Sequence, residues 1–405
     1  MSEARPREIA RVVAAATISN FGSMLTRIAL PFVAIDVLGA SAWDMSALSA
    51  ARLVPGLVFG IAIAAWIERR RKRGVMIGAD LAHAMLLLAV PLAAALGALS
   101  IPALLAFAAL SGALSYAFGV ARASFVPALA SREQIVAANA RIAAGSNAAE
   151  ALAFGGGGWL VQLLSAPLAL VVDAVSYLAS AALLAGIPER EAEAKPPRER
   201  GLARALGGLR VIRADARLGA LALVSVAVEL LSEVLGVVYF LFVREQLGFS
   251  PGALGTLFAA GSVAALASSL AAAWLGARFG ARGTMGCGLA GGALATAVLA
   301  LAPGPSWIGA ACIFAQQLGD AGLAVFEIHA LSARQRAAAL DVQSRVHGAF
   351  TFFGGWAALA GAALGGALGS VLGPRATIAL VAAAMLALGA SWLAFAPRYE
   401  ESASD

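Results

Sequence analysis

Long apolar runs follow one another along the chain with few polar interruptions. Each has the length of a bilayer crossing, for which a helix needs about 20 mainly apolar residues. The runs do not alternate polar and apolar residues at every second position, as the strands of a β-barrel would. We therefore predict twelve membrane-spanning helices, at approximately 9–38, 46–67, 75–97, 101–121, 137–164, 166–187, 217–243, 251–275, 283–303, 306–330, 346–372 and 376–396.

Basic residues gather in the N-terminal tail and in the even-numbered connections between these runs. The second connection carries an unbroken basic run, 69–73, and the sixth, 188–216, is rich in arginine, whereas the odd-numbered connections are short and almost free of Lys and Arg. Lys and Arg mark cytoplasmic loops. We therefore expect both termini and residues 188–216 to face the cytoplasm, as an even number of spans requires.

The polar segment 188–216 lies near the midpoint, and its charged, Pro-containing sequence is typical of a linker. It divides the chain into an N-terminal bundle, 1–187, and a C-terminal bundle, 217–405. The halves resemble each other: Gly157–Gly158 corresponds to Gly365–Gly366, and Trp66 to Trp274, at an offset of 208. A parallel repeat of this kind is typical of two six-helix bundles.

Composition excludes several classes of protein. Hydrophobic residues make up 61% and charged residues 13%, with a mean hydropathy of +0.85, whereas a soluble domain is about a quarter charged. The net charge of +6 fits cytoplasmic loops and does not call for nucleic acid. Cys287 and Cys312 give no disulfide framework, and His83, His329 and His347 show no metal-ligand spacing.

The sequence also argues against an enzyme. It has no clustered nucleophile, acid–base pair or metal set for a polytopic membrane enzyme, and we expect no cofactor. There is no GK[ST] phosphate loop, so ATP hydrolysis is not expected, and any work done across a membrane would draw on an ion gradient. The N-terminus, with charges of both signs before the first apolar run, predicts a cytoplasmic tail rather than a cleaved signal peptide.

Five segments carry a family resemblance: Ser19–Phe32, Ala79–Leu81, Arg122–Asn139, Asp173–Leu178 and Leu331–Val346. With them, the whole chain resembles the major facilitator superfamily, and more narrowly the bacterial exporter branch that includes macrolide efflux pumps and enterobactin-type siderophore exporters. The resemblance implies an all-α membrane protein of twelve helices in two six-helix bundles. It also implies alternating access, a bacterial cytoplasmic (inner) membrane location and, we expect, a monomer.

Two family motifs are altered. In the loop after the second span, Arg69, Lys72 and Arg73 fit the motif, whereas Ala64, Glu68 and Arg71 replace its Gly, Asp and second Gly. In the fifth span, the antiporter motif keeps the pair Gly157–Gly158 and lacks its Pro.

The family loop acts as a latch, in which an acidic residue pairs with basic residues or a helix N-terminus of the other half in one conformation. Here the resemblance assigns that role to a set on one side of the membrane: Glu68, Arg69, Lys72 and Arg73, with Asp80 and Arg122 as partners. The alternatives are topogenic charge for the loop and a static ion pair for Asp80 and Arg122.

Ionisable residues within spans are costly and therefore point to function. Glu229 and Glu233 share one helical face; like charges at that spacing repel, so we expect one of them to bind a proton readily. Gln316, Asp320 and Glu327 lie on one face of the tenth span. Solvated charges at the outer vestibule (Glu229, Glu233) or at the cytoplasmic mouth (Glu327) are the alternative.

Four further polar residues in the first half are candidates for the substrate and proton pathway: Asn20, Arg27, Arg52 and Glu150. Glu150 precedes the glycine run of the fifth span and could instead pair locally. Arg27 and Arg52 could pair statically with Glu229, Glu233 or Asp173.

Together these features predict a secondary active exporter of a small amphipathic molecule, drug-like or siderophore-like, that works by alternating access and proton antiport. Its partners would be the substrate, protons and membrane lipid. A uniporter, an importer and a flippase of a lipid-like substrate are alternatives with the same fold.

Overall fold

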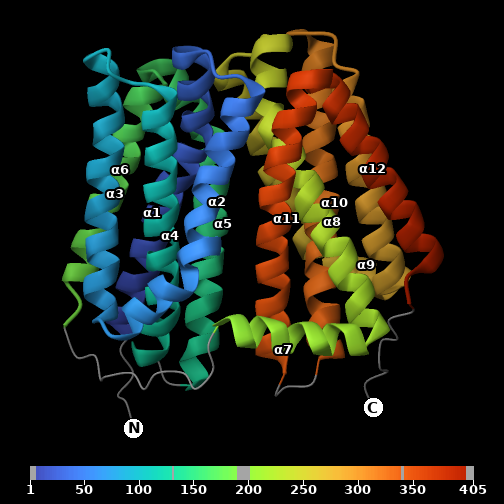
Figure 1. Ribbon diagram of the computed structural model, residues 1–405, viewed down its shortest axis with the longest axis horizontal. Helices are drawn as coiled ribbons and strands as arrows, with labels where there is room; N and C mark the ends of the chain where they lie inside the picture. Colours follow the sequence, from blue (N-terminus) through green and yellow to red (C-terminus); the bar gives the residue numbers. More distant parts are fainter. Residues whose placement is uncertain (1–5, 130–131, 189–200, 339–341, 398–405) are drawn as a thin grey trace. The chain divides into compact units, whose positions relative to one another are not determined.

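The computed structural model describes residues 6–129, 132–188, 201–338 and 342–397. These residues form helices and connections, with no strand among them (Figure 1). The α-helices are α1 (Pro6–Phe32), α2 (Ala42–Glu68), α3 (Lys72–Ala95), α4 (Ile101–Leu129), α5 (Arg132–Leu164), α6 (Ala166–Ala185), α7 (Gly201–Ala214), α8 (Ala216–Leu241), α9 (Pro251–Ala300), α10 (Trp307–Ala337), α11 (Gln343–Leu372) and α12 (Pro374–Phe395). Two π-helices, η1 (Val33–Val37) and η2 (Phe242–Gln246), follow α1 and α8.

Ten helices in the described part of the chain are long and apolar enough to cross a bilayer. One of them, α9, has 50 residues and breaks at Gly280, where φ is 68° and ψ is 159°. At about 1.5 Å per residue, α9 is about 75 Å long, which is enough for two crossings of a core about 30 Å thick. Counting α9 twice and adding α5, with 33 residues, gives the twelve crossings predicted.

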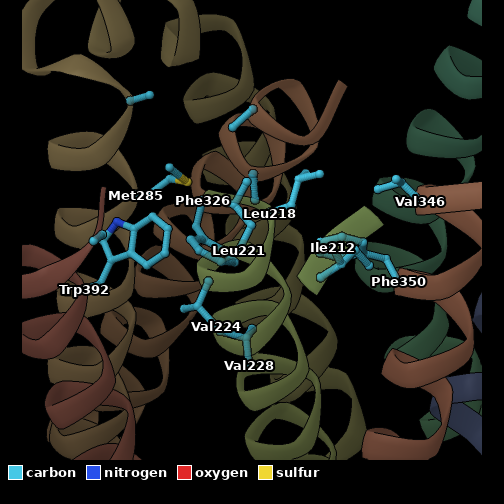
Figure 2. Packing of buried hydrophobic residues seen from close by; sticks show 14 of the residues in the cluster. Ile212, Leu218, Leu221, Val224, Val228, Met285, Phe326, Val346, Phe350 and Trp392 are labelled. Atoms are coloured by element: carbon cyan, nitrogen blue, oxygen red, sulfur yellow. The ribbon is translucent and has the colours of Figure 1, made fainter. Parts of the chain in front are cut away.

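The predicted linker, 188–216, is partly helical, because α7 occupies its second half. Residues 189–200 lie outside the described part, as do the tails 1–5 and 398–405. The helix α7 buries an apolar side chain against α11. Its Ile212 is 5% exposed and packs in one cluster with Val346 and Phe350 of α11 (Figure 2). A helix with one apolar stripe can bury it against neighbours in this way.

The chain divides into two compact units that differ slightly from the predicted halves. The first comprises Met1–Ala40, Leu48–Arg198 and Ser250–Thr256; the second comprises Ser41–Ala47, Glu199–Phe249 and Leu257–Asp405. The start of α2 thus belongs to the second unit and the start of α9 to the first. The helix α7 belongs to the second unit.

Within the first unit, α1 packs against α5 and α6, and α3 packs against α4 and α6. Within the second, α8 packs mainly against α11 and α12, and α7 lies across the ends of α8 and α11 (Figure 1). Figure 2 shows the apolar core of the second unit, where Leu218, Leu221 and Val224 of α8 are buried near Phe326 and Trp392.

The internal repeat is visible in backbone detail. The π-helices η1 and η2 begin 209 positions apart, and each is followed by a glycine with positive φ, Gly39 at 63° and Gly248 at 73°. The N-caps of α6 and α12 share another unusual conformation: Ser165 has φ 80° and ψ 155°, and Gly373 has φ 78° and ψ 161°.

Side chains repeat as well. Arg73, near the start of α3, donates to the carbonyl of Leu184 near the end of α6, at 3.0 Å. Arg282, after the break in α9, donates to the carbonyl of Leu393 near the end of α12. The second part of α9 therefore corresponds to α3, and α12 to α6.

Candidate transport site

A polar network joins α8 and α10 inside the second unit. The Tyr239 hydroxyl donates to Gln316 Oε1 at 3.2 Å, and Gln316 Nε2 donates to Asp320 Oδ2 at 2.7 Å. Gln317 Nε2 donates to Gln316 Oε1 at 2.9 Å and to the Tyr239 hydroxyl at 3.3 Å. Tyr239 and Gln316 are buried. The network therefore fixes the Asp320 carboxylate while leaving its other oxygen, Oδ1, outside these bonds.

A second group of charges lies along the same two helices. Glu229 interacts electrostatically with Glu233 on α8 and with Glu327 on α10, in both cases repulsively. Arg334, on α10, attracts both Glu229 and Glu327, and its guanidinium lies 4.5 Å from the ring centre of Phe350. The Arg334 guanidinium therefore partly balances the charges of two carboxylates, Glu229 and Glu327.

The acidic face of α8 is turned toward glycines of α11. A Cβ built on Gly354 would lie 3.7 Å from Cγ of Glu229, and one built on Gly361 would lie 3.1 Å from Cβ of Glu233. At Gly361, the same Cβ would also lie 2.3 Å from the carbonyl oxygen of Leu230. The absent side chains allow α8 and α11 to approach closely with both acids at their contact.

The structure thus places the five predicted site residues of α8 and α10 in two sets: Gln316 and Asp320 in the hydrogen-bonded network, and Glu229, Glu233 and Glu327 in the set that interacts electrostatically. Carboxyl side chains of this kind can hold and release protons. Such groups within membrane spans are expensive unless they are paired or hydrated, which favours a functional role.

The candidates of the first unit are more scattered. Asn20 donates to the carbonyl of Ser146 on α5 at 3.1 Å and so ties α1 to α5. Arg27 and Arg52 are exposed, and Arg27 donates to the sulfur of Met24 at 3.6 Å. Glu150 is partly buried.

The pairing of Asp173 with Arg27, one of the alternatives that the sequence left open, is not formed in this structure. Asp173 instead accepts hydrogen bonds from the hydroxyls of Thr26 and Ser176. The reason is orientation: Asp173 is 1% exposed and points into the first unit, whereas Arg27 lies at its surface.

The predicted latch residues fall into two groups. Lys72 donates to the carbonyls of Glu68 and Arg70, at 3.1 and 2.7 Å, and Arg73 binds the end of α6. Both basic residues are thus engaged within their own unit. The surface positions of Glu68, which is partly buried, and Arg69, which is exposed, are compatible with a latch.

Asp80 and Arg122 are not a pair. Asp80 is fully buried, and neither oxygen of its carboxylate has a hydrogen-bond partner among the described residues. The predicted static ion pair is therefore wrong, because Asp80 points between helices of the first unit and not toward the loop.

Sequence reasoning missed Tyr239, Gln317 and Arg334. Arg334 lies beyond the predicted tenth span, 306–330, and therefore in a predicted connection, whereas in the structure it lies within α10, whose end is at Ala337. Its position seven residues after Glu327, two helical turns along the same face, was the available signal. Tyr239 offered no such signal, because an aromatic residue in an apolar run most often packs in the core.

Comparisons with known proteins agree with this fold. The family model described as Major Facilitator Superfamily matches residues 12–237 and 221–405. No curated protein matches the chain.

Solved structures are similar over nearly the full length. A nucleoside transporter, NupG, has a TM-score of 0.76 at 12% identity, with 96% of this chain and 99% of that chain covered. A bacterial homologue of the iron transporter ferroportin, in an inward-facing state, has 0.76 at 15% identity, with 98% and 100% covered. A bacterial homologue of the lysosomal transporter Spinster has 0.74 at 14% identity, with 97% and 96% covered. With its family model matched along nearly the whole described chain, this protein belongs to the Major Facilitator Superfamily.

Proposed function

We propose that the chain is a secondary active exporter of a small amphipathic molecule in a bacterial inner membrane, driven by proton antiport. Both termini and the connection between the two six-helix halves would face the cytoplasm. The observation that carries the proposal is the set of three carboxyl side chains on α8 and α10, Glu229, Glu233 and Glu327, in which Arg334 attracts Glu229 and Glu327.

The chemistry supports coupling through this group. The charge of Glu229 is repelled by those of Glu233 and Glu327 and attracted by that of Arg334. A cationic part of a substrate that approached the group would displace a proton by the same electrostatics. Transport and proton release would then be linked, because each cation binds better when the other has left.

The hydroxyl and amide groups of Tyr239, Gln316 and Gln317 support recognition of a polar part of the substrate. They offer donors and acceptors beside an apolar helix surface, which suits an amphipathic molecule. A drug-like or siderophore-like substrate is compatible with this lining. The resemblance to exporters supports the outward direction.

The test uses the full-length protein in liposomes with an imposed pH gradient. Probes would be a lipophilic-cation dye, a macrolide and a catecholate siderophore. We expect Glu229→Gln and Glu233→Gln to abolish gradient-driven accumulation while downhill exchange persists. The control is Asp36→Asn, an exposed acid of η1.

Two results would contradict the proposal. Accumulation that survives in both variants would make the α8 pair structural and move coupling to Asp320 or Glu150. Accumulation in the opposite direction, or equilibration insensitive to the gradient, would instead support the importer or the uniporter.

A further inference from the structure

A second polar chamber lies inside the first unit, away from the residues assigned above to transport. It begins on α6, where Asp173, Tyr177 and Ser180 are spaced by four and three residues and therefore share one helical face. All three side chains are buried, at 1%, 5% and 0% exposure. This face is turned toward α1 and α3, the helices against which α6 packs most closely.

Hydroxyl groups of α1 and α6 surround Asp173. Thr26 donates to Oδ2, and Ser176 donates to Oδ1 at 3.0 Å. A Cβ on Gly22 would lie 1.9 Å from Oδ1, so the carboxylate lies directly against the backbone of α1. One turn further along α6, the Tyr177 hydroxyl is 2.8 Å from the Ser23 hydroxyl.

The α3 side of the chamber contains groups without partners. The His83 ring stacks on Tyr177 with centres 4.4 Å apart, and its Nε2 lies 3.0 Å from the Ser111 hydroxyl of α4. One turn earlier is Asp80. The Ser180 hydroxyl faces the Asp80 carboxyl without reaching hydrogen-bond geometry.

Four buried polar atoms therefore have no hydrogen bond of normal geometry within the described residues: Oδ1 and Oδ2 of Asp80, Nδ1 of His83 and Oγ of Ser180, although Ser180 lies near Asp80 and the Ala79 backbone lies near His83. Asp80 and Ser180 are 0% exposed, and His83 is 2% exposed. Each unsatisfied buried polar group costs about 1–3 kcal/mol, and more when it is charged. Such a concentration of unpaired atoms at one place calls for a bound species.

The charges of the two carboxylates also indicate a bound species. In the part of the chain that the structure describes, neither Asp80 nor Asp173 has a basic partner, and the charge of Asp80 acts unfavourably on Asp173. An ionised carboxylate without a counter-charge inside a membrane protein is unstable. The two hydroxyls at Asp173 satisfy its oxygens, which leaves Asp80 as the group in need of a positive charge.

The internal repeat provides a comparison within the same chain. At the offset of 209 that relates α3 to the second part of α9, Asp80 and His83 correspond to Leu289 and Gly292. At the offset of 208 given by the N-caps of α6 and α12, Asp173 and Tyr177 correspond to Val381 and Met385. At the offset of 209 given by Leu184 and Leu393, Asp173 corresponds to Ala382, which is also buried. Leu289, Val381 and Met385 are buried apolar residues of the core of the second unit. The fold therefore packs well with apolar side chains at these positions and does not itself require the polar ones.

We infer that this chamber between α3 and α6 binds one monovalent cation, a proton or a sodium ion, at the Asp80 carboxylate with the Ser180 hydroxyl as a second ligand. The donors are oxygens, which suit a hard cation. No group of three or more His, Cys, Asp or Glu side chains in the described residues is arranged to hold a metal ion, so a transition metal is not expected.

The titratable groups around Asp80 are His83 on its own helix and Asp173 and Tyr177 on α6; α1 and α4 contribute the Ser23 and Ser111 hydroxyls. The site is independent of the proposed coupling group, because it lies in the other unit and shares no residue with it.

The test uses the purified full-length protein in detergent. Radioactive sodium binding measures the sodium ion. Infrared difference spectra between mildly acidic and mildly alkaline buffers measure the proton, through the carbonyl stretch of a neutral carboxylic acid. We expect one of the two signals in the wild type, and the loss in Asp80→Asn of the part that comes from Asp80, which is one bound sodium ion or one carbonyl band. Asp36→Asn, an exposed acid of the same unit, should retain it.

A second variant covers the case in which Asp80→Asn does not fold. Ser180→Ala keeps the charge and removes one ligand, so we expect it to weaken sodium affinity by about tenfold or to shift the titration of Asp80 by a corresponding factor. Asp80→Leu, which copies the residue of the repeat, should fold and bind no cation. Absence of both signals in the wild type, or signals unchanged in Asp80→Asn and Ser180→Ala, would overturn the inference.

Discussion

At the scale of single residues, Gly158 shows how a missing side chain brings two segments together in the first unit. A Cβ at Gly158 would lie 2.1 Å from the carbonyl oxygen of Pro251 and 2.8 Å from Cα of Gly255. Neighbouring polar contacts join the same segments, since Trp159 Nε1 donates to the Thr256 hydroxyl at 3.1 Å. Small residues such as those of the glycine run in α5 allow such an approach within membranes.

We therefore expect Gly158→Ala to separate these segments and to cost about 1–3 kcal/mol of stability, as overpacking does. Gly156→Ala is the matched control, because a Cβ there would meet nothing within 4 Å. Thermal unfolding of the two purified variants measures the difference. Equal midpoints for both would show that the contact adjusts without cost.

The proposed latch makes a prediction at the same scale. Glu68 adjoins a run of basic residues at the end of α2, and its carboxylate could pair only in one conformation of an alternating cycle. We expect Glu68→Gln to slow transport in liposomes while folding and substrate binding stay near wild type. A wild-type transport rate would reduce Glu68 to a surface charge.

The acids on α8 and α10 could be predicted from the sequence, because a charge in an apolar run is conspicuous. The chamber around Asp80 could not, although its residues are equally visible. Inside a bilayer, a helix is apolar both toward lipid and toward its neighbours, so the pattern does not show which face points inward. The proximity of Asp80, His83 and Tyr177 depends on the antiparallel packing of α3 against α6.

At the scale of elements, the segment predicted as a linker, 188–216, contains the helix α7 and ends at the start of α8. Asp215 separates the two helices and caps α8: its Oδ1 accepts from the backbone N–H of Arg217 at 2.7 Å and of Leu218 at 3.2 Å. A capping Asp directly before an apolar run is a recognisable signal. The cap was not predicted, because the charged residues and prolines of 188–200 made the whole segment resemble a linker.

We expect Asp215→Ala to destabilise the second unit by about 1 kcal/mol, since two N–H groups at the helix start would lose their acceptor. Asp215→Asn keeps an acceptor oxygen and should remain close to wild type. Thermal unfolding in detergent measures both variants. If the two variants were equally stable, water would be replacing the cap.

At the scale of the whole molecule, the repeat explains why the fold was predictable. The two halves share their span lengths, their π-helices and their arginine contacts at the ends of α6 and α12. In the sequence, the repeat is visible only as a few matching residues, such as the glycine pairs 208 residues apart. The two halves differ in where their intramembrane acids lie. In the first half Asp80 and Asp173 lie between α3 and α6, whereas in the second half the candidate acids lie on α8 and α10.

Membrane orientation is the last prediction, and it depends on the distribution of basic residues. Most Lys and Arg residues lie in the N-terminal tail and the even-numbered connections, which predicts that these connections face the cytoplasm. Single cysteines at Ala98, exposed between α3 and α4, and at Ala214, exposed at the end of α7, would report the two sides. Cys287 and Cys312 would first be replaced by serine to provide an unreactive background. We expect an impermeant thiol reagent to label position 98 in intact cells and position 214 only after permeabilisation. The reverse labelling pattern would place both termini outside the cell. The proposed orientation, and with it the proposed direction of export, would then be wrong.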